Sequence, residues 1–236
     1  MSDSQGELQQ NLEAVRQRLE RACERAGRRP DEVTLVSVSK TVDAARVRQA
    51  YELGERDFGE NYGQHLRDKA AELADLGDLR WHFIGPLQRN KVKYTTSRAA
   101  LIHSIHSTSL IKEIDRRAAA AGWQQEVLVQ LNISGEETKS GVGDEALAPL
   151  LDAFAGCSHT RCVGLMTMPP FFDDGDAARP FFAALRELRD RAAATQRPNV
   201  DLRHLSMGMT GDFEVAIAEG ATLVRVGTAI FGAREY

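Results

Sequence analysis

The sequence predicts an α/β protein that folds as a single (β/α)8 barrel, or TIM barrel, with an extra helix at its N-terminus. Eight short apolar segments alternate with seven helical segments, which is the order of elements in such a barrel. The turn after the first apolar segment reads SKTVDA, whereas a doubly wound nucleotide-binding sheet, the competing architecture, normally carries GxGxxG there. No Pro/Gly/Ser-rich linker divides the 236 residues, so we expect one domain over 1–236, with the N-terminal helix in 1–29 and the barrel in 30–236.

The expected strands are short runs rich in Val, Leu and Ile, as is typical of parallel strands that are buried on both faces. The first run, VTLVSVSK, is unusual because it ends in a lysine. The strands are expected at 33–39, 56–59, 81–85, 100–105, 126–132, 162–168, 202–207 and 222–227.

The expected helices lie between these strands and show apolar residues at helical spacing. Glycine, the residue that most readily ends a helix, follows several of them, as at Gly54, Gly77, Gly122 and Gly220. The helices are expected at 5–26, 43–53, 62–76, 88–94, 109–121, 145–154, 177–194 and 212–219.

Composition and charge exclude several classes of protein. A net charge of −4 provides no general attraction for nucleic acid or anionic lipid, so we expect neither as a partner. No apolar run reaches the roughly 18 residues of a membrane span, and the N-terminus MSDSQGELQQ lacks the features of a secretory signal. Only three cysteines occur and none form a CxxC pair, which suits a reducing cytoplasm.

Barrel enzymes place their chemistry at the C-terminal ends of the strands. Lys40 ends the first expected strand, Asn61 follows the second, and Met168 ends the sixth. Lys40 could be the first residue of its strand to reach water, or an amine that points into a site. A lysine acts as a nucleophile only as the neutral amine, and can then form a Schiff base with a carbonyl group.

The turns after the last two strands suggest an anion site. Barrels often hold a phosphate there, and SMGMTGD and VGT offer the Ser206 hydroxyl, glycines including Gly227, and the Thr228 hydroxyl. Either turn alone would be read as ordinary turn chemistry. Together, opposite a strand-end lysine, they indicate a phosphorylated carbonyl compound, either a sugar phosphate or pyridoxal phosphate.

Arg225 lies two residues before Gly227 and therefore shares its face of the eighth strand. An interior arginine is costly unless it has a partner, which could be a barrel carboxylate or a ring nitrogen of a cofactor. A permanently charged donor at that nitrogen would keep a pyridine unprotonated and weaken the ring as an electron sink.

The chain resembles the pyridoxal phosphate homeostasis family, also called the proline synthetase co-transcribed homologue family. The resemblance runs from about 33 to 236 and rests on VSVSKTV, FGENY, WHFIGPLQRNK, NISGEETKSG, GLMTMP, LSMGMTGDFEVAI and VRVGTAIFGAREY. It implies the fold type III barrel of the alanine racemase class without the C-terminal β domain of that class.

By that resemblance Lys40 carries pyridoxal 5′-phosphate (PLP) as a Schiff base. Ser206, Gly227 and Thr228 would hold the phosphate, and Arg225 would approach the pyridine nitrogen. The resemblance also implies that Asn61, Met168 and Met207 line or pack against the cofactor pocket. The chain departs from many relatives at Val42, where they carry a second lysine, so exchange of the cofactor could differ.

Two functions from different classes remain open. The resemblance favours a cytoplasmic, monomeric carrier that buffers PLP and delivers it to apo PLP-dependent enzymes, without robust catalysis. The alternative is a PLP-dependent amino-acid racemase or decarboxylase, and a sugar-phosphate aldolase is a third. Racemisation needs a base on each face of the cofactor, and no tyrosine or cysteine is evidently placed opposite Lys40.

Four polar residues near the third strand have no assigned role. His82, Gln88, Asn90 and Lys91 could satisfy one another in a barrel loop or take part in ligand exchange or docking. Lys139, in ETKSG, is expected to be a surface lysine.

Overall fold

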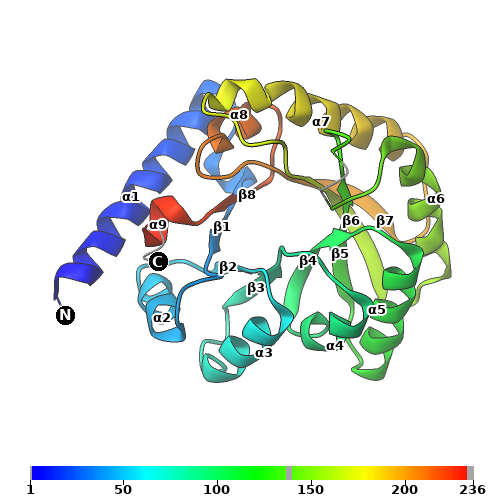
Figure 1. The fold of residues 1–236 in the computed structure, drawn as a ribbon, viewed down its shortest axis with the longest axis horizontal. Coiled ribbons are helices and arrows are strands. Elements are labelled where there is room, and N and C mark those ends of the chain that lie inside the picture. The colour runs from blue at the N-terminus through cyan, green and yellow to red at the C-terminus, as the bar shows by residue number, and fades with distance from the viewer. Residues whose placement is uncertain (1, 137–139, 233–236) are drawn as a thin grey trace.

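The computed structural model describes residues 2–136 and 140–232 and shows a closed barrel of parallel strands (Figure 1). β1 pairs with β2 on one side and with β8 on the other, which closes the barrel. The predicted (β/α)8 barrel is thus confirmed. The strands are β1 Thr34–Val38, β2 Asp57–Glu60, β3 Arg80–Phe83, β4 Ala99–Ile105, β5 Gln125–Leu131, β6 Thr160–Thr167, β7 Val200–Ser206 and β8 Leu223–Val226.

The helices surround the barrel on its outer side (Figure 1). Asp43 and Ser107 begin α2 and α5 by accepting hydrogen bonds from backbone amides of the first turn. Gly54 and Gly220 follow α2 and α8 with φ of 97° and 95°, in the left-handed region that favours glycine. The helices are α1 Ser2–Arg25, α2 Ala44–Glu52, α3 Gly63–Glu72, α4 Val92–Thr95, α5 Thr108–Ala120, α6 Leu147–Asp152, α7 Arg179–Ala193, α8 Phe213–Ala218 and α9 Thr228–Phe231.

Several helical segments differ from the sequence-based expectation. The segment 88–94 is a 3-10 turn, Arg89–Lys91, followed by the short α4. α3 ends at Glu72, four residues before the predicted end, and in the turns that follow Asp75 and Asp78 pair with Arg48 and Arg56. The four-residue α9 was not predicted, because its residues lie directly after the β8 strand motif.

Successive side chains along each strand point alternately into two apolar cores, one inside the barrel and one between the strands and the helices. Phe58, Phe83 and Leu205 belong to the outer core. Val36 lies in the inner core, so the period of two along β1 directs Val38 and Lys40 to the interior as well. The inner core consists of Val36, Leu101, Leu128, Val163, Met166 and Leu223.

The N-terminal helix α1 packs against α8 and α9 on the outside of the barrel. Arg16 Nη2 on α1 donates to Glu55 Oε1 at 2.5 Å, and Glu55 Oε2 accepts from Ser37 Oγ of β1 at 2.6 Å. Asn11 Nδ2 donates to the Ile230 carbonyl of α9 at 3.1 Å. The helix therefore braces the last elements of the chain, which bound the site described below. Within the described residues, no helix is long and apolar enough to cross a membrane.

Candidate functional site

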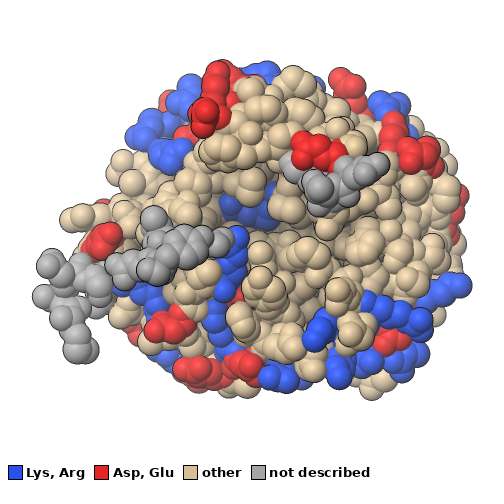
Figure 2. All heavy atoms as spheres, in the orientation of Figure 1, with Lys and Arg blue, Asp and Glu red and all other residues tan. Residues whose placement is uncertain are grey.

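A cavity of about 350 Å³ opens at the C-terminal ends of the strands. Figure 2 shows a hollow near the centre of this face, with basic side chains in and beside it. Six residues that the sequence singled out converge on the cavity from four separate strand ends. They are Lys40, Asn61, Met168, Arg225, Gly227 and Thr228.

Lys40 follows β1 and is held in place by an ion pair on the outer side of the strand. Ser39 points away from the barrel, and its hydroxyl donates to Glu60 Oε1 at 2.7 Å. Lys69 Nζ on α3 donates to the same oxygen at 2.6 Å and to the Ser39 carbonyl at 2.7 Å. This buried pair fixes the backbone directly before Lys40 and directs the half-buried lysine into the cavity.

Asn61 is positioned by close packing of the loop after β3. A Cβ at Gly85 would lie 2.1 Å from the Asn61 carbonyl oxygen, so only glycine fits there. Ile84, Gly85 and Pro86, from the WHFIGP motif, line the cavity beside Asn61. The glycine of this motif is thus required because the backbones of Gly85 and Asn61 come close together at the rim of the cavity.

Two loops form an anion cradle on the other side of the cavity. No described group accepts a hydrogen bond from the amides of Thr210 and Gly211, and both residues line the cavity. Thr228 begins α9, so its own amide and that of Ala229 also lack helical partners. Thr228 Oγ1 donates to Thr210 Oγ1 at 3.2 Å, which joins the two loops. Free amides and hydroxyls in one concave place are suited to a phosphate.

Asp212 shapes the cradle. Its Oδ1 accepts a hydrogen bond from the Met209 amide at 2.6 Å, and its own amide donates to the Met209 carbonyl at 3.2 Å. Burial raises the pKa of Asp212, although the Met209 amide and the charge of Arg225 act in the opposite direction. The carboxylate closes the turn and leaves the amides of Thr210 and Gly211 available to a ligand.

Arg225 provides a buried positive charge at the base of the cavity and is 3% exposed. Its Nη1 donates to Ser206 Oγ at 2.5 Å and its Nη2 to the Thr167 carbonyl at 3.0 Å. No described group accepts from Nε, so this N–H is available to a ligand. Burial lowers the pKa of Arg225 to about 10, with Asp212 acting in the opposite direction.

Two residues of the predicted set do not line the cavity. Ser206 is fully buried, and its hydroxyl contacts Arg225 and His103 beneath the cavity. Met207 points outward from β7 into the core between the strands and the helices, because adjacent residues of a strand face opposite sides. The assignment of Ser206 to the phosphate and of Met207 to the cofactor pocket therefore stays a prediction. Since neither side chain lines the cavity, the contacts would have to come from the backbone near the cradle. Lys139 lies outside the described residues.

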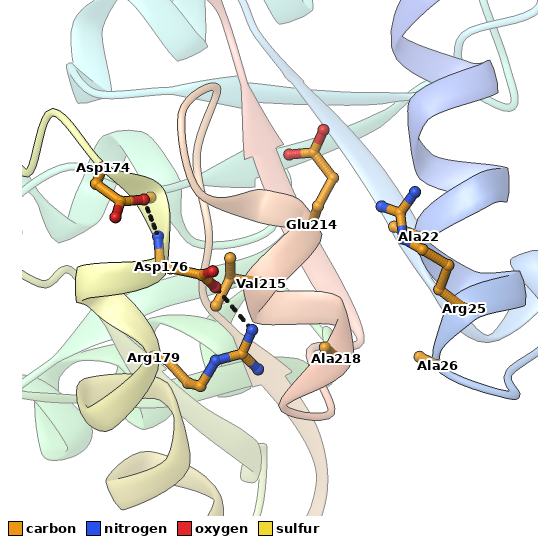
Figure 3. A pocket seen from close by; sticks show the side chains of 10 residues that line it. Ala22, Arg25, Ala26, Asp174, Asp176, Arg179, Glu214, Val215 and Ala218 are labelled. Atoms are coloured by element: carbon orange, nitrogen blue, oxygen red, sulfur yellow. Dashed lines mark hydrogen bonds and ion pairs between the residues drawn. The ribbon is translucent and has the colours of Figure 1, made fainter.

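A second cavity, of about 430 Å³, lies between α1, α8 and the loop before α7 (Figure 3). Most of its charged groups take part in hydrogen bonds or ion pairs. Arg179 Nη2 donates to Asp176 Oδ1 at 2.7 Å, and Asp174 accepts from the Asp176 amide at 3.0 Å. Glu214 pairs with Arg18 at 2.8 Å. This cavity lacks a nucleophile and an anion cradle, so the barrel mouth is the candidate site.

Comparison with known proteins identifies the family. The model of the alanine racemase N-terminal domain matches residues 10–235. A pyridoxal phosphate homeostasis protein from Aquifex aeolicus is 46% identical over 227 residues, which cover 96% of this chain and 98% of that protein. The chain belongs to the pyridoxal phosphate homeostasis protein family.

Solved structures agree with this membership. PipY from Synechococcus elongatus, solved with PLP bound, matches with a TM-score of 0.83 and 34% identity, covering 95% of this chain and 100% of PipY. A protein of unknown function from Bifidobacterium adolescentis matches with a TM-score of 0.90 and 36% identity, covering 98% and 97% of the two chains. At least 95% of the chain therefore lies within the fold that it shares with these two structures.

Proposed function

We propose that the protein binds PLP at the barrel mouth through Lys40 and buffers or delivers it, and that it is not a dedicated amino-acid enzyme. The observation that carries this proposal is that one cavity holds a lysine, an anion cradle and a buried arginine with a free N–H. PipY, which has PLP bound in its solved structure, shares the fold at 34% identity.

The residues of the cavity fit the chemical groups of PLP. The amides of Thr210 and Gly211 and the Thr228 hydroxyl would hold the phosphate. Arg225 Nε would donate to the ring nitrogen, and Asn61 and Met168 would bound the ring. PLP supplies an aldehyde that condenses with a lysine amine. The chain itself supplies the amine, the orientation of the ring and the enclosure of the reactive group.

The set of titratable groups favours a carrier over a racemase or decarboxylase. In the described lining of the cavity, the titratable side chains besides Lys40 are Asp212 and Arg225. Asp212 holds the cradle loop, and Arg225 is bound to Ser206 and Thr167. Neither is placed as a second acid or base opposite Lys40, which racemisation requires.

We also propose that the protein acts as a cytoplasmic monomer that supplies apo PLP-dependent enzymes. The free thiols of Cys23, Cys157 and Cys162 support a reducing compartment.

Titration of the apo protein with PLP tests the proposal. We expect a visible absorbance band that Lys40→Ala abolishes and that Lys112→Ala, at an exposed lysine of α5, retains. Incubation of the loaded protein with an apo-transaminase should restore transaminase activity. Turnover of D- or L-alanine that depends on Lys40 would instead establish a racemase, and a colourless protein that reacts only with sugar phosphates would establish an aldolase.

A further inference from the structure

A chain of buried polar side chains crosses the interior of the barrel beneath the cavity. Asp57 Oδ1 on β2 lies 2.9 Å from His82 Nε2 on β3. His82 Nδ1 lies 2.9 Å from His103 Nε2 on β4, and His103 Nδ1 lies 2.8 Å from Ser206 Oγ on β7. Arg225 of β8 completes the chain by donating to Ser206 Oγ. The sequence-based alternatives for His82, a loop network or a role in docking, are thus replaced by a place inside the barrel.

The Asp57 end of the chain is an acceptor. Arg80 donates to both carboxylate oxygens of Asp57, at 2.8 and 2.5 Å. Burial alone would raise the pKa of Asp57, but the hydrogen bonds from His82 and Arg80 outweigh it and hold the pKa below its usual value. An ionised carboxylate has no proton to donate, so His82 must donate to it from Nε2.

The Arg225 end of the chain is a donor, because a guanidinium group has no acceptor. The Ser206 hydroxyl accepts from Arg225 and then donates to His103 Nδ1, which leaves the His103 proton on Nε2 for His82. Burial is the largest of the effects that lower the pKa of His103 well below its usual value, in agreement with a neutral ring. The hydrogen bonds therefore assign a proton to Nε2 of each ring.

The position of the chain connects it with the cofactor site. Most interior neighbours are apolar, as at Val36, Leu101 and Leu128, so the polar residues are not needed to fill the barrel. The chain of polar side chains ends at Arg225, the one arginine among the described residues that line the cavity. Nη1 and Nη2 of Arg225 donate to Ser206 and Thr167, whereas Nε has no acceptor among the described residues.

We propose that Asp57, His82 and His103 are positioning residues that hold the Arg225 guanidinium, through Ser206, toward the ring nitrogen of bound PLP. The inference rests on the proposed function. Without His103, the Ser206 hydroxyl loses its acceptor and is free to rotate, so the guanidinium loses a fixed partner. The ring nitrogen would then meet a less ordered donor, and both the affinity for PLP and the electronic state of the bound ring would change.

Nitrogen NMR of the wild-type apo protein tests the direction of the chain without any variant. We expect a proton on Nε2 in both rings and a neutral His103 ring at pH 7. A proton on Nδ1 of either ring, or a charged ring, would overturn the proposed arrangement.

Absorbance and affinity measurements on variants test the link to the cofactor. In His103→Phe the visible band of bound PLP should shift and PLP should bind roughly three- to tenfold more weakly. His106→Phe is the matched control, because His106 Nδ1 faces the Ser104 carbonyl outside the chain, and it should retain the wild-type band and affinity. In an Arg225→Lys background, the effect of His103→Phe should disappear, since the histidine acts through the arginine.

The outcomes separate the two proposals. A folded His103→Phe protein with the wild-type band and affinity, or an undiminished effect in the Arg225→Lys background, overturns the positioning role. If His103→Phe does not fold, Asp57→Asn decides, because it keeps an acceptor oxygen but removes the charge and should shift the band in the same direction. Failure of borohydride to fix PLP on wild-type Lys40 would defeat the proposed function itself, whereas a normal adduct with unchanged bands defeats only this inference.

Discussion

Replacement of Arg225 by methionine should leave the stability of the apo protein almost unchanged. The same replacement should weaken PLP binding. Burial lowers the pKa of this arginine from 12.5 to about 10. Since one pKa unit corresponds to about 1.4 kcal/mol, the charge costs the apo protein about 3 kcal/mol. Methionine removes this cost, but it also removes two charge-assisted hydrogen bonds, to Ser206 and Thr167, worth about 1.5 kcal/mol each. The two effects nearly cancel, so the net change in the free energy of unfolding is within about 1 kcal/mol.

Thermal unfolding and PLP titration measure the two effects separately. A change of 1 kcal/mol corresponds to a shift in Tm of about 2–4 °C for a chain of this size. Loss of a charged donor to the ring nitrogen should weaken PLP binding about 10- to 100-fold. Arg161→Met is the control, because Arg161 pairs with Glu126 on the surface at the opposite end of the barrel and should affect neither quantity strongly. A fall in Tm of more than about 10 °C, or unchanged affinity for PLP, would refute the reasoning.

Three further predictions follow from the same structure. Thr228→Val should weaken PLP binding about tenfold with little change in Tm, because the exposed hydroxyl contacts only Thr210 within the described residues; equal affinity in a titration would remove Thr228 from the cradle. The pKa of Asp57 is lowered in the folded state. Its contribution to stability is therefore present at a pH above the pKa of the unfolded state, about 4, and is lost as the pH falls toward the pKa of the folded state. Urea unfolding of Asp57→Asn should therefore show a shallower loss of stability below about pH 4 than the wild type, and identical slopes would contradict this. Gly164→Ala should destabilise the barrel by several degrees or prevent folding, since its Cβ would lie 2.1 Å from a backbone carbonyl of β7, whereas Gly156→Ala, with nothing within 4 Å, should melt as the wild type.

The barrel and most of the candidate site were predictable because they depend on local patterns. Buried parallel strands are short apolar runs, and the chemistry of a barrel gathers where those runs end. Lys40, Asn61 and Thr228 are far apart in sequence, but each follows a strand, so the fold alone brings them to one cavity. The helices that are followed by a glycine could be recognised from the sequence in the same way.

The polar chain through the barrel was not predictable from local patterns. Which interior residues meet across a barrel depends on strand tilt and stagger, and irregular pairing beside β4 adds to this. Asp57, His82 and His103 were each visible as polar residues within apolar strands, and this is the signal that could have found them. The outward direction of Met207 follows from the period of two once Ser206 is placed inside.

Borohydride reduction of the PLP-loaded protein, followed by peptide mapping, tests the central claim most directly. The account predicts a single modified residue, Lys40, and no modification when excess inorganic phosphate keeps PLP out of the cradle. Reduction that labels a different lysine, or that leaves Lys40 unmodified at saturating PLP, would contradict it.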